Sequence, residues 1–138
     1  MPTNSTTPYL ARALAIALAV SSCAAPETSL PRAGRYFLQR DHGADTLELL
    51  TNGRYVHTTS FDGSRFASDS GTWGTTVIDG KPHLFLDRWV LWEPPAPGGL
   101  MTDAAAGTWY PQPESQGDGL FSLPVDPARG LVFLPIHQ

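Results

Sequence analysis

The sequence lacks the means to form a disulfide, because Cys23 is the only cysteine among its 138 residues. It also lacks an apolar run long enough to cross a bilayer. The run at residues 13–20 (ALAIALAV) falls far short of the ~20 apolar residues that a spanning helix needs. These two absences mean that the fold depends on packing alone, and that any membrane attachment uses something other than a spanning helix.

Sequence motifs for common enzyme chemistry are also missing. No serine stands in a G-x-S-x-G pattern, and Gly80-Lys81 is followed by Pro82, which is incompatible with a phosphate-binding loop. The carboxylates are scattered, and no dinucleotide fingerprint occurs. The formal net charge is −4 with dispersed arginines, which disfavours binding to nucleic acid. We therefore expect a protein that is not an enzyme and has no cofactor.

The four histidines show no spacing typical of a metal site. His42, His57, His83 and His137 are too far apart in sequence to form a local i, i+2 or i, i+4 pair. They could still meet carboxylates such as Asp41 or Glu48 in space. The simpler interpretation is four isolated surface histidines and no metal site.

The N-terminal residues have the layout of a secretory signal, in which a basic residue, Arg12, precedes the apolar run and then small residues. Val20-Ser21-Ser22-Cys23 resembles the lipobox of bacterial lipoproteins, with Val where that family usually has Leu. The resemblance implies that signal peptide 1–22 is removed and that Cys23 is acylated. The alternative is an ordinary signal peptide cut after Ala24 or Ala25, which would give a secreted protein.

Lipidation at Cys23 has consequences for location. Residues 23–33, with two prolines and no apolar periodicity, would form an extended tether between the membrane and the domain. A multiply acylated cysteine is an effectively permanent membrane anchor. By resemblance to the sorting rule of Gram-negative lipoproteins, Ala24 after the cysteine implies the outer membrane, with the domain facing the periplasm. The expected location is therefore the bacterial cell envelope.

Residues 34–138 are predicted to form one all-β domain, because short alternating segments broken by turn residues replace any sustained helical periodicity. We expect an antiparallel meander of about seven short strands that forms a barrel or a sandwich. Gly34–Arg40 is the first strand. A Pro/Gly-rich connection is expected at about residues 93–119, with at most a helical turn around Asp103–Ala106.

Three hairpins are predicted within this domain. The first turns at Asn52-Gly53, where a two-residue turn would pair Leu49 with Val56, and a three-residue bulged turn would pair Leu49 with Tyr55 and Leu47 with His57. We favour the bulged turn, because it places Leu47, Leu49 and Tyr55 on one apolar side.

The second hairpin turns at Asp79-Gly80. It pairs Val77 with Pro82, Thr75 with Leu84 and Trp73 with Leu86, and the large apolar members of these pairs are expected to face the core.

The third hairpin runs from Leu120 to Ile136, with Asp126-Pro127 in a type I turn and Gly130 in the left-handed position. Taken together, the segments GRYFL, LELLTNGRY, GTWG and LFL within residues 34–86 resemble the small lipocalin-like β domains of envelope lipoproteins. This resemblance implies the architecture and says little about a ligand.

Aromatic residues are the remaining candidates for a binding role. Trp73 is expected in the core. Trp89, Trp92, Trp109 and Tyr110 lie at or near the long connection, where such rings can stack on a sugar or clamp a partner. The alternative is that they plug one end of a small barrel.

Three function hypotheses follow. The first is a non-enzymatic, lipid-anchored envelope protein that binds another envelope component or has a structural role. The second is a lipocalin-type carrier of a small apolar ligand, and the third is an envelope hydrolase.

Overall fold

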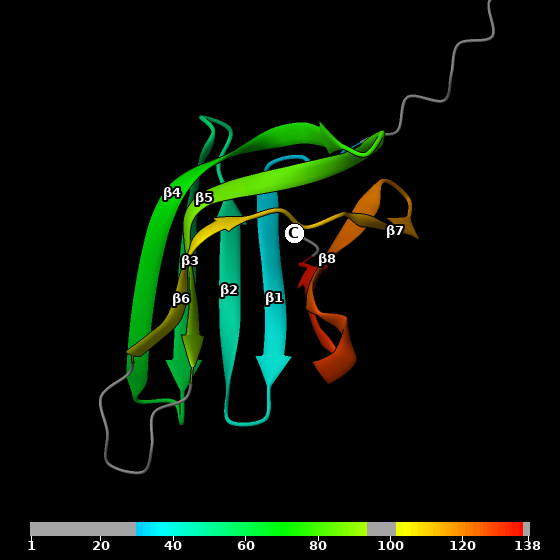
Figure 1. The fold of residues 1–138 in the computed structure, drawn as a ribbon. Helices are drawn as coiled ribbons and strands as arrows, with labels where there is room; N and C mark the ends of the chain where they lie inside the picture. The colour runs from blue at the N-terminus through cyan, green and yellow to red at the C-terminus, as the bar shows by residue number, and fades with distance from the viewer. Residues whose placement is uncertain (1–29, 94–101, 137–138) are drawn as a thin grey trace, which may run out of the picture.

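The chain forms a single antiparallel β-sheet with nine strands in the described residues, which are 30–93 and 102–136 of the computed structural model. The strands are β1 (Gly34–Arg40), β2 (Gly43–Leu49), β3 (Arg54–Phe61), β4 (Arg65–Ile78), β5 (Lys81–Glu93), β6 (Thr102–Trp109), β7 (Glu114–Gly117), β8 (Leu120–Asp126) and β9 (Leu131–Pro135). Their order in the sheet is β6-β5-β4-β3-β2-β1-β9-β8-β7. Strands β1 to β6 are thus a meander, and β9 adds the last three strands to the other side of β1 (Figure 1).

The all-β class and the antiparallel meander are confirmed, whereas the closed barrel and the sandwich are wrong. Within the described residues, β6 and β7 are the two edges of one sheet and do not pair with each other. The sheet curves strongly because β4 and β5 bend over one of its ends (Figure 1). Strand β5 has a local irregularity at Arg88, whose φ is +55°, next to a register shift between Leu86 and Trp89 opposite β6.

The predicted hairpin registers are confirmed. Leu49 pairs with Tyr55 and Leu47 with His57, as the bulged turn requires. The second hairpin pairs Trp73 with Leu86, Thr75 with Leu84 and Val77 with Pro82. In the third, a 3-10 turn at Pro127–Arg129 is capped by Asp126, and Gly130 has φ +68°. Turn residues and side-chain alternation therefore determine these registers.

Two expectations about the second half of the chain are wrong. Val77 is 69% exposed, because the tip of the β4–β5 hairpin extends past the body of the sheet, so this part of the hairpin does not face the core. The segment at 93–119 contains β6 and β7, and Asp103–Ala106 lies in a strand where at most a helical turn was expected. Pairing with β5 supplies the stability that this Ala- and Gly-rich sequence lacks by itself.

The core occupies the concave side of the curved sheet. Its buried members are Tyr36, Leu38, Leu47, Leu49, Tyr55, Leu84, Leu86, Trp89, Leu123 and Phe133. Trp73 is half-buried and packs against this cluster, and its indole N–H donates to the carbonyl oxygen of Leu50 at 2.9 Å. The buried members come from six strands, and Trp73 on β4 and Trp109 on β6 pack against them, so this core holds the two ends of the sheet together.

Candidate functional site

A chain of charged side chains crosses the otherwise apolar concave side of the sheet. Arg40 Nη2 lies 2.6 Å from Asp45 Oδ2, and its Nε donates to Asp45 Oδ1 at 3.0 Å, so this ion pair is bidentate. His57 Nε2 lies 3.4 Å from the same Asp45 Oδ2. Strand alternation places all three on the core side, because Arg40, Asp45 and His57 follow the same pleat as the leucines beside them.

Asp69 on β4 completes this buried charge network, which we define as Arg40, Asp45, His57 and Asp69. His57 Nδ1 lies 2.6 Å from Asp69 Oδ1. The indole N–H of Trp92 donates to the same oxygen at 3.0 Å, and the Tyr55 hydroxyl donates to Oδ2 at 3.3 Å. Each carboxylate therefore accepts hydrogen bonds from several donors, as a buried charge requires.

Aromatic rings cover the network. The indole of Trp89 stacks on the imidazole of His57, with ring centroids 4.2 Å apart and planes at 18°. Phe133 meets both rings edge-on, and Trp109 packs against Trp89 at 4.5 Å. Because His57 is 0% exposed, no substrate can reach it without opening the core.

The buried charge network is balanced when His57 carries a proton, because two carboxylates then face one guanidinium and one imidazolium. Burial disfavours the charged imidazolium, but hydrogen bonds to Asp45 and Asp69 outweigh burial and raise the pKa of His57. Burial likewise disfavours the Asp45 carboxylate, yet hydrogen bonds from His57 and Arg40 lower its pKa. The network therefore favours the protonated form of His57 and contributes to the stability of the fold.

The interpretation of His57 as an isolated surface histidine is wrong, because the side chain is buried and ion-paired. His42 is exposed and His83 half-buried, while His137 lies outside the described residues. Among the described residues, no group of three His, Cys, Asp or Glu side chains has a metal-binding arrangement.

The predicted site residues have different environments. Cys23 lies outside the described residues. Trp89 is in the core at 6% exposed, and Trp92 and Trp109 are half-buried. Tyr110 is 50% exposed. The structure therefore brings Trp89 and Trp109 together inside the molecule and leaves Tyr110 on its surface.

A separate open groove lies where the chain enters the domain. Its volume is about 660 Å³. The walls come from residues 31–36, residues 48–52, residues 119–121 and residues 135–136, so four segments that are distant in sequence meet there. We call this feature the entry groove, because residues 31–33 precede β1 and form part of its wall.

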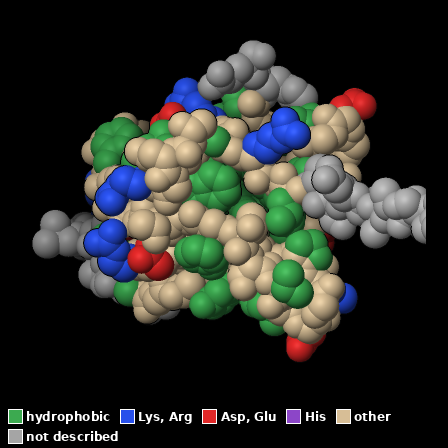
Figure 2. Space-filling view, turned by 90° about the horizontal axis from the view of Figure 1, so that it is seen from above, with side chains coloured by type: hydrophobic (Ala, Val, Ile, Leu, Met, Phe, Trp, Pro, Cys, Tyr) green, Lys and Arg blue, Asp and Glu red, His purple; other side chains and the backbone are tan. Residues whose placement is uncertain are grey.

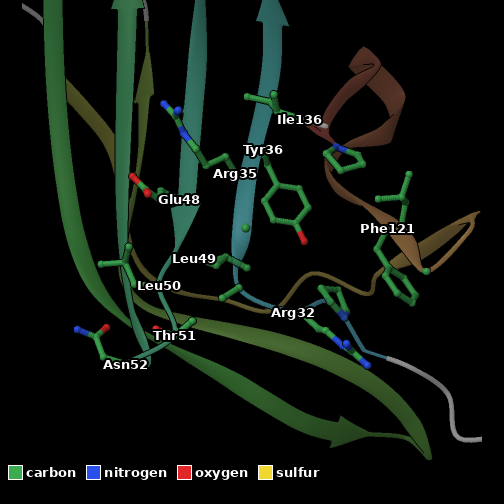
Figure 3. Close-up of a pocket in the computed structure, with 16 residues that line it drawn as sticks. Arg32, Arg35, Tyr36, Glu48, Leu49, Leu50, Thr51, Asn52, Phe121 and Ile136 are labelled. Carbon is green, nitrogen blue, oxygen red and sulfur yellow. The ribbon is translucent and has the colours of Figure 1, made fainter. Parts of the chain in front are cut away.

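Tyr36 is the distinctive residue of the entry groove. Its side chain is buried, at 5% exposed, but its hydroxyl forms no hydrogen bond with another described residue. Figure 3 shows the hydroxyl pointing into the groove, toward the space between Arg32 and Phe121. Burial raises the pKa of the Tyr36 hydroxyl, so it is a protonated donor at neutral pH.

The charged side chains of the groove lie in two places: Arg32 is on the side that the hydroxyl faces, whereas Arg35 and Glu48 point to the opposite face of β1 and β2 (Figure 3). Arg32, Arg35 and Glu48 line the groove, and none forms an ion pair with another described residue. Apolar walls lie beside them, including Leu49, Phe121 and Ile136. Figure 2, which looks onto this end of the molecule, shows hydrophobic side chains across the middle of the face and Lys and Arg side chains around them. On the side of the Tyr36 hydroxyl, the groove therefore offers apolar contact, one cation without an ion-pair partner (Arg32) and one unused hydroxyl.

No motif in the sequence marks Tyr36 as a site residue. Strand alternation in Gly34–Arg40 places Tyr36, Leu38 and Arg40 on the core side, which explains its burial. The charged residue Arg40 on the core side of this strand was the feature of the sequence that could have indicated the buried charge network. No sequence signal shows that the Tyr36 hydroxyl lacks a partner, because this depends on where residues 119–121 lie.

Within the described residues, no helix has the length and hydropathy to cross a bilayer. No family model, curated protein or solved structure matches this chain.

Proposed function

We propose that this chain is a non-enzymatic lipoprotein of a bacterial envelope, attached to the membrane through acylated Cys23, whose domain binds an envelope component in the entry groove. The lone cysteine stands at the one position that lipobox processing requires. The observation that carries the binding role is the Tyr36 hydroxyl, which forms no hydrogen bond with a described residue and is open to the groove into which it points. A hydroxyl that is open to a groove and has no protein partner can donate to a ligand or to water.

The position of the groove supports the same proposal. Residues 31–33 form part of its wall, so the tether reaches the domain at the groove itself. The seven residue-to-residue steps from Cys23 to Leu30 span at most ~25 Å when fully extended. A ligand in or near the membrane is therefore within reach of the groove.

Two alternatives fit the described residues less well. A lipocalin-type carrier needs an open apolar interior, but Leu47, Leu84 and Phe133 fill the concave side with no exposed surface. A hydrolase needs a reactive group open to substrate, whereas His57 lies under Trp89 with both ring nitrogens engaged. The entry groove remains the best candidate for contact with another molecule.

The experiment has two parts, both on the full chain in bacterial cells. With an alkyne-labelled fatty acid in the medium, we expect the wild-type protein to be labelled and Cys23→Ala to be unlabelled. A photoreactive phenylalanine analogue replaces Leu120, in the groove, or Leu134, which is 53% exposed and outside it. We expect an envelope adduct from position 120 only. Labelling of Cys23→Ala, or equal adducts from both positions, would contradict the proposal.

A further inference from the structure

We infer that the entry groove binds the headgroup of an anionic phospholipid in the bilayer that holds the acyl anchor. This inference rests on the proposed function and specifies the ligand of the same groove. The observation behind it is the juxtaposition of the free Tyr36 hydroxyl with the unpaired guanidinium group of Arg32 and with apolar side chains, including Leu49 and Phe121.

The charge of the groove selects for an anion. The whole chain has a formal net charge of −4, whereas the charged side chain next to the Tyr36 hydroxyl is the cation Arg32, and the carboxylate of Glu48 lies with Arg35 on the opposite face of the strands. This local excess of positive charge contrasts with the acidic remainder of the surface. Guanidinium groups donate to phosphate oxygens in a geometry that suits both partners.

The apolar wall distinguishes a lipid from a freely soluble anion. Leu49, Phe121 and Ile136 lie beside the cationic side chains, and most of the residues that line the groove are apolar. In a phospholipid the phosphate adjoins the glycerol esters and the start of the acyl chains, so charged and apolar parts are equally close together. The Tyr36 hydroxyl can donate to an ester carbonyl or to a phosphate oxygen between the two parts.

The size and position of the groove agree with this ligand. A volume of about 660 Å³ admits a headgroup and leaves the acyl chains in the bilayer. Because Cys23 is covalently linked to the membrane surface through a tether of limited length, lipid headgroups are present at an effective concentration in the mM range. Even weak intrinsic affinity is then enough for occupancy.

The test uses the acylated full chain in vesicles of phosphatidylcholine alone or mixed with phosphatidylglycerol, with backbone hydrogen exchange as the readout. We expect slower exchange in residues 31–36, 48–52 and 119–121 when phosphatidylglycerol is present. Tyr36→Phe keeps the ring and removes the donor, so the fraction of phosphatidylglycerol that gives half-maximal protection should rise about 3- to 10-fold. Arg32→Gln should raise it several-fold.

Arg54→Gln is the matched control. Arg54 is exposed, lies just after Asn52 and does not line the groove, so this substitution removes the same charge from the same end of the domain. We expect less than a 2-fold change for it. Equal sensitivity of Arg32→Gln and Arg54→Gln would mean that general surface charge, and not the groove, attracts the membrane, which overturns the inference.

Other outcomes separate the inference from the proposed function. Equal protection on both kinds of vesicle overturns the lipid assignment. So does protection that appears only when a soluble peptidoglycan fragment or an acidic peptide is added, and in that case the proposed function stands with a different ligand. If none of these probes protects the groove and position 120 forms no adduct in cells, both proposals fail.

Discussion

The buried charge network makes the stability of this domain depend on pH in a defined direction. The pKa of His57 in the folded protein is raised above the unfolded value of 6.5, so the folded state holds this proton more tightly than the unfolded state does. The stabilisation is fully present below about pH 6.5 and is lost as the pH rises through the folded pKa. Each unit by which the folded pKa exceeds 6.5 contributes ~1.4 kcal/mol.

The part of the free energy of unfolding that depends on the His57 proton is large for a domain of this size. When His57 is neutral, Asp45 and Asp69 face only Arg40, and one negative charge is left uncompensated among residues that are almost fully buried. Removing one partner of a buried ion pair costs ~3–5 kcal/mol, while small domains have ~5–15 kcal/mol of stability in total. His57→Gln, which cannot carry the proton, should therefore lose ~3–5 kcal/mol at low pH.

The assay is urea unfolding of the purified chain between about pH 5 and pH 9. We expect the free energy of unfolding of the wild type to fall above about pH 6.5, with a slope of at most ~1.4 kcal/mol per pH unit. Asp45, whose pKa is lowered below its ordinary value of 3.8, adds stability that is present throughout this range and is lost only as the pH falls below about 3.8. His83→Gln, a substitution outside the network, should keep the wild-type profile. A flat wild-type profile above pH 6.5, or a rising one, would refute this reasoning.

Three further substitutions test other parts of the structure. Trp92→Phe removes the indole donor to Asp69 and should lower the free energy of unfolding by ~1.5–3 kcal/mol in the same urea assay, and an unchanged midpoint would count against the hydrogen bond. Gly71→Ala should prevent stable folding, since its Cβ would meet the Asp87 carbonyl oxygen and the Tyr55 ring, whereas Gly107→Ala has open space around it and should change stability by less than ~1 kcal/mol. If both alanine variants show the same thermal midpoint, the close approach at Gly71 is not real. Tyr36→Phe should leave stability within ~0.5 kcal/mol of the wild type, because the hydroxyl has no partner to lose, and a larger loss in urea would indicate an internal hydrogen bond.

Local sequence rules predicted much of the sheet. The first strand was predicted with its observed bounds. Asp79-Gly80, where both residues have positive φ, gave the observed register directly. Asn52-Gly53 left two registers open, and the shared apolar side of Leu47, Leu49 and Tyr55 indicated the one that is observed. The same rules gave the wrong outcome for Val77, since pairing within a hairpin does not reveal whether the hairpin tip has anything to pack against. Strand β6 was missed for a related reason: its Ala-rich sequence forms a strand only because β5 lies beside it.

The candidate sites depend still more on long-range contacts. Asp69 and Trp92 are 23 residues apart and meet only because β4 and β5 pair across the bend. Alternation does place Arg40, Asp45 and His57 on the apolar side of their strands, so the sequence contained a signal that these charges must neutralise one another. The environment of Tyr36 could not be predicted in this way. Residues 119–121 lie at the start of β8, which joins the sheet beyond β1 only through the pairing of β9 with β1.

The central claim is that the Tyr36 hydroxyl donates a hydrogen bond to an anionic phospholipid of the membrane. The most direct measurement is the ¹³Cζ resonance of Tyr36, assigned by its loss in Tyr36→Phe, in the acylated full chain in nanodiscs with and without phosphatidylglycerol. We expect this resonance to shift in the anionic nanodiscs, while that of Tyr110, which is half exposed and outside the groove, stays in place. Identical Tyr36 resonances in both kinds of nanodisc, or equal shifts of Tyr36 and Tyr110, would contradict the claim.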